Sequence, residues 1–326
     1  MGVDRKALKR AARANMREKR PSPMLVTLVY LLLTSGISQV VDFAASNPVN
    51  ALEQAARAAA GGAGYDQVMW AWLSAGGNGN VIVLFLTILT TLYGMVLSFG
   101  YYAYTLRRTD GEDAGYGTLL SGFNYVGRII VMQLMIALFT LAWCFLTVLP
   151  AALIGSVAMA VLLVVLDGST LAMVLGAIFL YGAIMAGAIL GSYLSMRYTL
   201  APCFLADQPE LGAMEAVRRS RTLLRSRLME VFTLALSFIG WMLLASLIPL
   251  VVGGIVVAAV LFLLPSNTAP IYYALGIYGG MVLAYLATLP FQMWIVPYYT
   301  GTFTQYYRTL VPRRTADLEH GRPEPF

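Results

Sequence analysis

The sequence predicts an all-α membrane protein, a bundle of about six transmembrane helices arranged as helical hairpins, and two observations carry that prediction. Apolar residues make up 59% of the 326 positions and charged residues 12%, about half the roughly 25% found in soluble domains. Crossing a hydrocarbon core of about 30 Å takes roughly 20 apolar residues in a helix, and lipid cannot satisfy backbone groups outside regular structure. Suitable apolar runs occupy positions 24–41, 81–106, 129–166, 171–196, 231–264 and 271–303.

The basic residues predict the orientation, because short cytoplasmic loops carry an excess of Lys and Arg. If each run crosses once and both termini are cytoplasmic, 21 of the 22 Lys and Arg residues fall inside and only Arg57 falls outside. Splitting the run 129–166 at Pro150 would carry Arg197 and the segment 215–232 outside, which the charge bias disfavours. We therefore predict a multi-pass protein of the plasma membrane with cytoplasmic N- and C-termini.

The chain is expected to form one transmembrane domain at 23–310. A basic cytoplasmic helix at 1–22 precedes it and a polar cytoplasmic tail at 311–326 follows it. Within the domain, the sequence predicts an outer loop at 44–80 and an inner amphipathic helix at 211–228.

The first apolar run follows a basic leader and could be mistaken for a secretory signal peptide. The leader is long for such a signal and further apolar runs follow, so an uncleaved first span is favoured. The stretch "DFAAS" after the run keeps a cleaved peptide as the alternative.

The segment "EAVRRSRTLLRSRLMEVF" predicts a basic amphipathic helix. Together with the preceding Met214, its apolar positions Val217, Leu224 and Leu228 form one helical stripe. Its arginines are Arg218, Arg219, Arg221, Arg225 and Arg227. Such a helix can lie in the inner interface, where each basic residue near anionic lipid contributes roughly 1 kcal/mol. We expect anionic headgroups of the inner leaflet as the partner, with a docking face for another protein as the alternative, and no nucleic acid.

Two stretches of the chain follow one plan, which predicts a tandem pseudo-repeat of helical hairpins. Each contains a leucine and a tryptophan five residues apart, then a proline, a turn, a second long run and another proline. The positions are Leu138, Trp143, Pro150 and Pro202 in the first stretch, and Leu236, Trp241, Pro249 and Pro297 in the second. A few matched positions in one sequence also leave chance as an explanation.

Small residues and prolines inside these runs predict how the arms pack. Gly187 and Gly191, like Gly276 and Gly280, are four residues apart and let two helices approach closely. Pro150 and Pro249 are interpreted as kinks, with ion coordination at broken helices as the alternative. A straight helix over the 38 positions 129–166 would be about 57 Å long, so the arms must tilt, bend or protrude.

The sequence predicts no catalytic residue, no cofactor and no metal site, and hence no enzyme. Catalysis usually needs paired carboxylates, a histidine with a nucleophile, or metal ligands within reach, and the predicted spans hold no histidine and no carboxylate pair. Asp110, Glu112 and Asp113 follow two arginines in a short inner loop, and solvated turn charges are favoured over a metal site there.

Several segments closely resemble the bacterial membrane proteins grouped as domain of unknown function 975. The most specific is "LGAMEAVRRSRTLLRSRLMEVFTLALSFIGWMLLASL", followed by "WIVPYYTGTFTQYYRTL", with "RYTLAPCFLADQPE" upstream. The resemblance covers most of the chain and implies a multi-span bacterial protein, of a Gram-positive lineage, with no established activity. It also extends distantly to the membrane portion found with some glycerophosphodiester phosphodiesterases. The apolar extensions after Pro150 and Pro249 depart from the family's expected lengths.

These observations predict a non-enzymatic scaffold or accessory subunit that binds lipid or another membrane protein through its long apolar hairpins. The alternative is a permease for an apolar or amphipathic substrate, such as a lipid or a peptide, that uses no buried ionisable residues.

Overall fold

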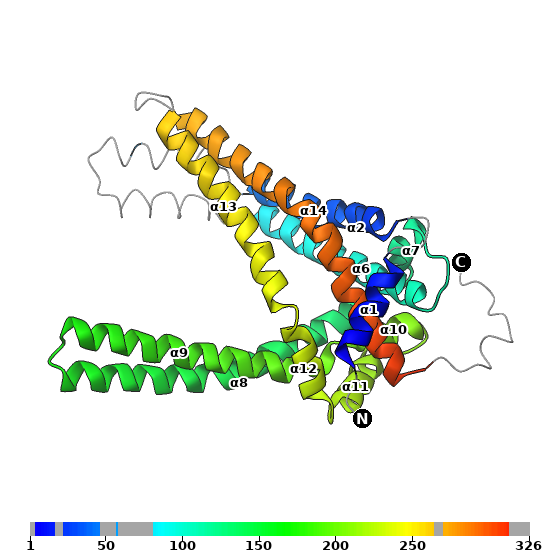
Figure 1. Cartoon of the computed structure of the whole chain (residues 1–326), viewed down its shortest axis with the longest axis horizontal. Helices are drawn as coiled ribbons and strands as arrows, with labels where there is room; N and C mark the ends of the chain where they lie inside the picture. Colours follow the sequence, from blue (N-terminus) through cyan, green and yellow to red (C-terminus); the bar gives the residue numbers. More distant parts are fainter. Residues whose placement is uncertain (1–3, 17–21, 46–56, 58–80, 264–269, 313–326) are drawn as a thin grey trace. The chain divides into compact units, whose positions relative to one another are not determined.

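The computed structural model describes residues 4–16, 22–45, 57, 81–263 and 270–312, and its regular structure there is helical throughout (Figure 1). Most of the loop predicted at 44–80 and nearly all of the tail predicted at 311–326 lie outside the described residues. Six described segments are long and apolar enough to cross a membrane, which confirms the all-helical, multi-span prediction. They are Pro23–Val41, Leu84–Thr109, Tyr116–Val165, Thr170–Asp207, Leu228–Val260 and Gly279–Leu310.

The chain divides into two compact units. Unit 1 comprises Met1–Arg5 and Asn124–Ser237, and unit 2 comprises Lys6–Phe123 and Phe238–Phe326. The domain predicted at 23–310 therefore contains parts of both units.

Unit 1 is dominated by a hairpin of two long helices, α8 (Val126–Val165) and α9 (Thr170–Ser195). The turn between them depends on two residues in the left-handed region, Asp167 with φ 45° and Gly168 with φ 65°. The Ser169 hydroxyl then caps α9 by accepting a hydrogen bond from the Ala172 amide at 3.2 Å. A side-chain cap of this kind satisfies one of the amides that the first helical turn leaves unpaired.

After α9 the chain of unit 1 makes shorter turns. These are η3 (Met196–Tyr198), α10 (Ala201–Asp207), α11 (Ala213–Leu224) and α12 (Leu228–Leu236). Pro202 lies in the first turn of α10, where its missing N–H breaks no helical hydrogen bond. The amphipathic helix predicted at 211–228 is thus α11, which ends at Leu224, followed by a turn and the start of α12.

Unit 2 contains the remaining helices. They are α1 (Arg5–Asn15), α2 (Pro23–Leu31), η1 (Leu32–Gly36), α3 (Ile37–Ala45), α6 (Val81–Thr109), α7 (Tyr116–Leu120), η2 (Ser121–Tyr125), α13 (Ile239–Leu263) and α14 (Pro270–Leu310). Within the predicted N-terminal helix at 1–22, the described helix is α1, which begins in unit 1 at Arg5 and continues in unit 2. α2, η1 and α3 follow one another without a break and together form the first span.

The core of unit 2 is rich in aromatic and hydroxyl side chains. Tyr101 is 2% exposed, stacks on Tyr30 with ring centroids 4.5 Å apart, and shares a 2.7 Å hydrogen bond with the Thr27 hydroxyl. A Cβ added to Gly100 would lie 1.9 Å from the carbonyl oxygen of Leu119, so only glycine allows α6 to approach α7 this closely. Burying hydroxyls costs little free energy when they hydrogen-bond one another, and such pairs fix how the helices of this core align.

Candidate functional site

The helix α11 carries most of the arginine cluster and is fixed to unit 1 by its other face. It packs against α8, α10 and η3. Its buried residues are Ala213, Ala216, Val217, Ser220 and Leu224. The Ser220 hydroxyl donates a 2.8 Å hydrogen bond to the Arg197 carbonyl, which ties α11 to the break between α9 and α10.

The apolar stripe of this segment is covered by protein. Val217, Leu224 and Leu228 are at most 8% exposed, whereas Met214 is 60% exposed. The sequence predicts that this stripe enters the lipid interface. In the fold three of its four residues are buried, because helices that precede α11 in the chain pack over them. The exposed side of α11 is therefore its arginine face.

Two of the arginines on that face share one carboxylate. Arg219 donates through Nε to Glu215 Oε1 at 3.0 Å and through Nη1 to the Gln208 side-chain oxygen at 2.9 Å. Arg218 forms an ion pair with Glu215 at 2.5 Å. The hydrogen bond from Arg219, followed by the charge of Arg218, lowers the pKa of Glu215 below its ordinary value.

The other three arginines extend the same surface. Arg221 and Arg225 are exposed, and Arg227 forms an ion pair with Glu230 at 3.6 Å. Surface pairs of this kind contribute only about 0–1 kcal/mol. The arginine side chains can therefore exchange these carboxylates for phosphate oxygens, to which a guanidinium is geometrically matched.

Sequence reasoning did not identify a further site residue in unit 1, Arg197. The Arg197 guanidinium lies 5.1 Å from the ring centroid of Trp143, whose indole N–H donates to the Tyr198 hydroxyl at 3.3 Å. The Nε of Arg197 is buried and has no hydrogen-bond partner in the described part of the chain. Arg197 is the only formally charged residue between Asp167 and Asp207, a local signal that could have singled it out.

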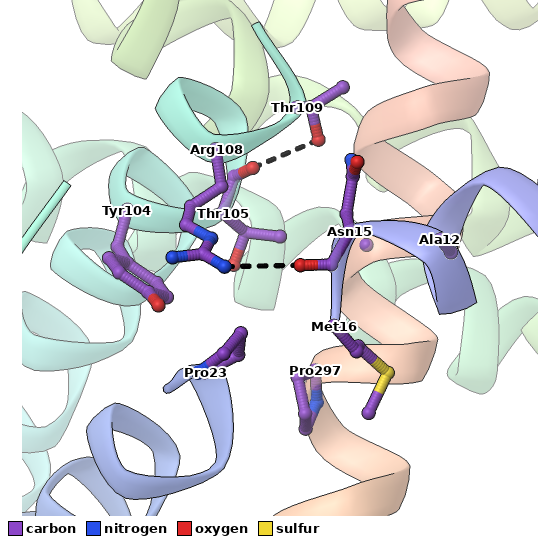
Figure 2. Close-up of a pocket in the computed structure, with 10 residues that line it drawn as sticks. Ala12, Asn15, Met16, Pro23, Tyr104, Thr105, Arg108, Thr109 and Pro297 are labelled. Atoms are coloured by element: carbon purple, nitrogen blue, oxygen red, sulfur yellow. Dashed lines mark hydrogen bonds between the residues drawn. The ribbon is translucent and has the colours of Figure 1, made fainter. Parts of the chain in front are cut away.

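Unit 2 holds a pocket of about 30 Å³ between α1, α2, α6 and α14 (Figure 2). Tyr104, Arg108 and Thr109 come from the last turns of α6, and Asn15 comes from the end of α1. Arg108 donates through Nη2 to the Asn15 carbonyl at 3.1 Å, and the Thr109 hydroxyl donates to the Thr105 carbonyl at 2.9 Å. Tyr104 is 2% exposed, and its hydroxyl has no hydrogen-bond partner among the residues that the structure describes.

The helix α1 is attached beside this pocket through its basic residues. Lys9 Nζ lies 4.2 Å from the ring centroid of Phe238, and the Arg13 guanidinium lies 4.9 Å from that of Tyr298. A Cβ added to Gly301 would lie 3.6 Å from the Ala12 Cβ, so the two helices meet at small residues. Cation–π contacts of this kind contribute roughly 0.5–2 kcal/mol each.

The acidic turn after α6 differs from the sequence-based interpretation. Asp110 was expected to be a solvated turn charge, but its side chain is 7% exposed and pairs with Arg308 of α14. Both carboxylate oxygens accept hydrogen bonds from the guanidinium at 2.7 Å. The two residues are 198 positions apart, so no local pattern indicated the pair. Among the described residues, no group of three or more His, Cys, Asp or Glu could hold a metal ion.

The residues predicted to control helix packing lie inside the long hairpins. Pro150 is in α8 and Pro249 is in α13. Added Cβ atoms at the four glycines would meet the opposite arm at 2.5–2.8 Å. Gly187 and Gly191 face Thr147 of α8, whereas Gly276 and Gly280 face Val260 and Val256 of α13, respectively.

The six long apolar helices define a multi-pass α-helical membrane protein. The chain belongs to the family described as Protein of unknown function (DUF975), whose model matches residues 1–314. Neither a curated protein nor a solved structure matches the chain.

Proposed function

We propose that this chain is a non-enzymatic scaffold or accessory subunit of the bacterial plasma membrane, which binds another membrane protein through its long hairpins and anionic lipid through its arginine face. The observation that carries this proposal is the α8–α9 hairpin. Its two arms pack tightly on each other through glycines, and apolar side chains cover the outward surface along the whole length. Ile154 and Val164, for example, are 70% and 78% exposed.

The length of α8 favours a protein partner in addition to lipid. Its 40 residues correspond to about 60 Å at the helical rise. Even at a tilt of about 40°, the upper end of the usual range, such a helix rises about 46 Å, more than the hydrocarbon thickness of about 30 Å. One end of α8 then leaves the lipid core, and large exposed apolar surfaces outside lipid mark interaction sites.

The arginine face of α11 supports the lipid part of the proposal. The face carries Arg218, Arg219 and Arg221, with Arg225 at the C-cap, and all four are exposed. If this end of the protein is cytoplasmic, as the charge bias predicts, the face meets the negative surface potential of the inner leaflet. A triple variant Arg218→Gln, Arg221→Gln, Arg225→Gln should bind fewer anionic lipids, and binding of the wild type should weaken as salt is raised.

Native mass spectrometry of the protein extracted mildly from its own membrane tests the proposal directly. A stoichiometric protein companion is the expected result and identifies the assembly that the hairpins serve. A protein that carries only one class of lipid, together with substrate-dependent flux in sealed vesicles, would replace the scaffold with the alternative, a permease for an apolar or amphipathic substrate.

A further inference from the structure

A residue that lines the pocket in unit 2 carries a buried hydroxyl with unsatisfied hydrogen-bonding capacity. Tyr104 is 2% exposed, and its hydroxyl makes no hydrogen bond with any of the described residues. Leaving a buried polar group unpaired costs about 1–3 kcal/mol, and such groups in folded proteins nearly always have a protein, water or ligand partner. Tyr104 lines the pocket, so an occupant of the pocket that reaches its hydroxyl can supply the acceptor.

The chemistry of the lining selects an anion. Figure 2 shows the Arg108 guanidinium between the Tyr104 ring and Asn15. The phenol and the guanidinium both donate hydrogen bonds, and none of the ten lining residues is acidic. Arg108 is already oriented by its bond to the Asn15 carbonyl. A guanidinium held in this way matches the oxygens of a phosphate group.

The position of the pocket indicates the source of the phosphate. Pro23 begins the first candidate span and Thr109 ends the second, and both residues line the pocket. The pocket therefore lies at the level where two membrane spans reach the headgroup region. Basic pockets between transmembrane helices at this level bind lipid headgroups.

The volume limits what enters. A space of about 30 Å³ holds about two water molecules, which suffices for phosphate oxygens but not for a whole headgroup with its glycerol. Two phosphate oxygens can therefore enter, while the phosphorus and the rest of the lipid stay outside.

We propose that this pocket binds the phosphate of a membrane phospholipid, with the Tyr104 hydroxyl and the Arg108 guanidinium as donors. The inference rests on the lipid-binding part of the proposed function, and it adds a defined site that is separate from the arginine face of α11.

The test titrates lipid-stripped, full-length protein in detergent with phosphatidylglycerol and follows the bound lipid by native mass spectrometry. Tyr104→Phe removes only the hydroxyl. It should weaken the tightest binding step about fivefold, the equivalent of one hydrogen bond. Tyr93→Phe is the matched control, because Tyr93 lies on the same helix but not in the pocket, and it should bind as the wild type does. Arg108→Gln should weaken binding further, and a melting curve verifies that it still folds.

Three outcomes distinguish the ideas. Unchanged lipid binding in Tyr104→Phe overturns the pocket proposal and leaves the proposed function intact if the arginine-face variant still loses lipid. If Tyr104→Phe loses binding of inorganic phosphate but binds phosphatidylglycerol as the wild type does, the lipid proposal is also overturned, because the pocket then binds free phosphate. A wild type that binds no added phosphatidylglycerol at all removes the lipid part of the proposed function together with this site.

Discussion

Trp143 in the α8–α9 hairpin and Trp241 in the α13–α14 hairpin occupy matching places in the predicted repeat, seven and eight residues before a proline. Their partners differ in kind. The Trp143 ring faces the guanidinium of Arg197 at 5.1 Å, whereas the Trp241 ring packs edge-on against Trp294 with centroids 4.9 Å apart. One hairpin places a cation against the tryptophan and the other places an aromatic ring there. The same spacing therefore supports two different chemistries.

The second arms of the hairpins differ in the same region. α9 ends at Ser195 and the chain turns before Pro202, while α14 continues through Pro290 and Pro297 to Leu310. An internal proline removes a helical hydrogen bond and costs about 3 kcal/mol or more in isolation. α14 packs against α2 and α6, and beyond Pro297 its Thr304 hydroxyl shares a 2.9 Å hydrogen bond with the Thr109 hydroxyl of α6. Its side chains there, among them Tyr298, Phe303, Tyr306 and Tyr307, are at most 2% exposed. The free energy gained by burying these side chains outweighs the loss of helical hydrogen bonds at the prolines.

The largest expected effect concerns the ion pair that fixes the end of α14. Asp110→Asn should destabilise the protein by about 3 kcal/mol, because it leaves the Arg308 guanidinium buried with a neutral partner. The loss should appear as a lower midpoint in chemical unfolding. Asp113→Asn, at an exposed position in the same turn, is the control and should change little. Equal midpoints for the two variants would show that the pair stabilises nothing.

The next effect tests the close approach of α8 and α9. A Cβ at position 187 would lie 2.8 Å from the Thr147 carbonyl oxygen, a backbone atom that cannot rotate away. Gly187→Ala should therefore cost about 2 kcal/mol. Gly182→Ala on the same helix, where an added Cβ would meet nothing within 4 Å, carries the same gain in helix propensity. The difference between the two melting temperatures measures the contact alone.

A glycine-to-alanine change in the α13–α14 hairpin should reduce stability less. A Cβ at position 280 would lie 2.5 Å from a Val256 methyl, and a side chain can shift. Gly280→Ala should cost about 1 kcal/mol relative to Gly279→Ala, whose added Cβ meets nothing within 4 Å. If Gly280→Ala costs more than Gly187→Ala in thermal unfolding, the distinction between backbone and side-chain contacts is wrong.

A double-mutant cycle isolates the cation on the first tryptophan. Trp143→Leu and Arg197→Met should show a coupling energy of about 1 kcal/mol. The same arginine change combined with Trp241→Leu should be additive, because Trp241 packs on Trp294 instead. A coupling near zero for the first pair would mean that the two residues are merely adjacent.

The smallest effect is electrostatic and lies on α11. Because the folded-state pKa of Glu215 is lowered from its ordinary value of 4.5, its stabilising contribution is present above that value and is lost as the pH falls through the lowered pKa. Unfolding midpoints measured between pH 7 and pH 3 should fall slightly more for the wild type than for Glu215→Gln. Parallel curves would contradict a role for the pairs with Arg219 and Arg218.

Composition and periodicity were enough to predict helices and six candidate spans, because lipid leaves a long apolar segment few other structures. The spacing of the glycine pairs predicts close packing, and Cβ atoms added at these glycines would meet the opposite arm. Local patterns were insufficient for α11. The stripe at Val217, Leu224 and Leu228 has the periodicity of an interfacial helix, yet a helix covered by protein needs the same periodicity.

The amino-acid sequence by itself determined that this chain is a helical membrane protein with long apolar hairpins and basic segments between them. These properties depend on how each segment by itself partitions between lipid and water, so the composition of the segment is enough to predict them. Only the tertiary structure decided that Asp110 meets Arg308, that Arg197 lies on Trp143, and that Tyr104 and Arg108 line one pocket with the end of α1. Such contacts join residues far apart in the chain, so their energies depend on packing that no single segment encodes.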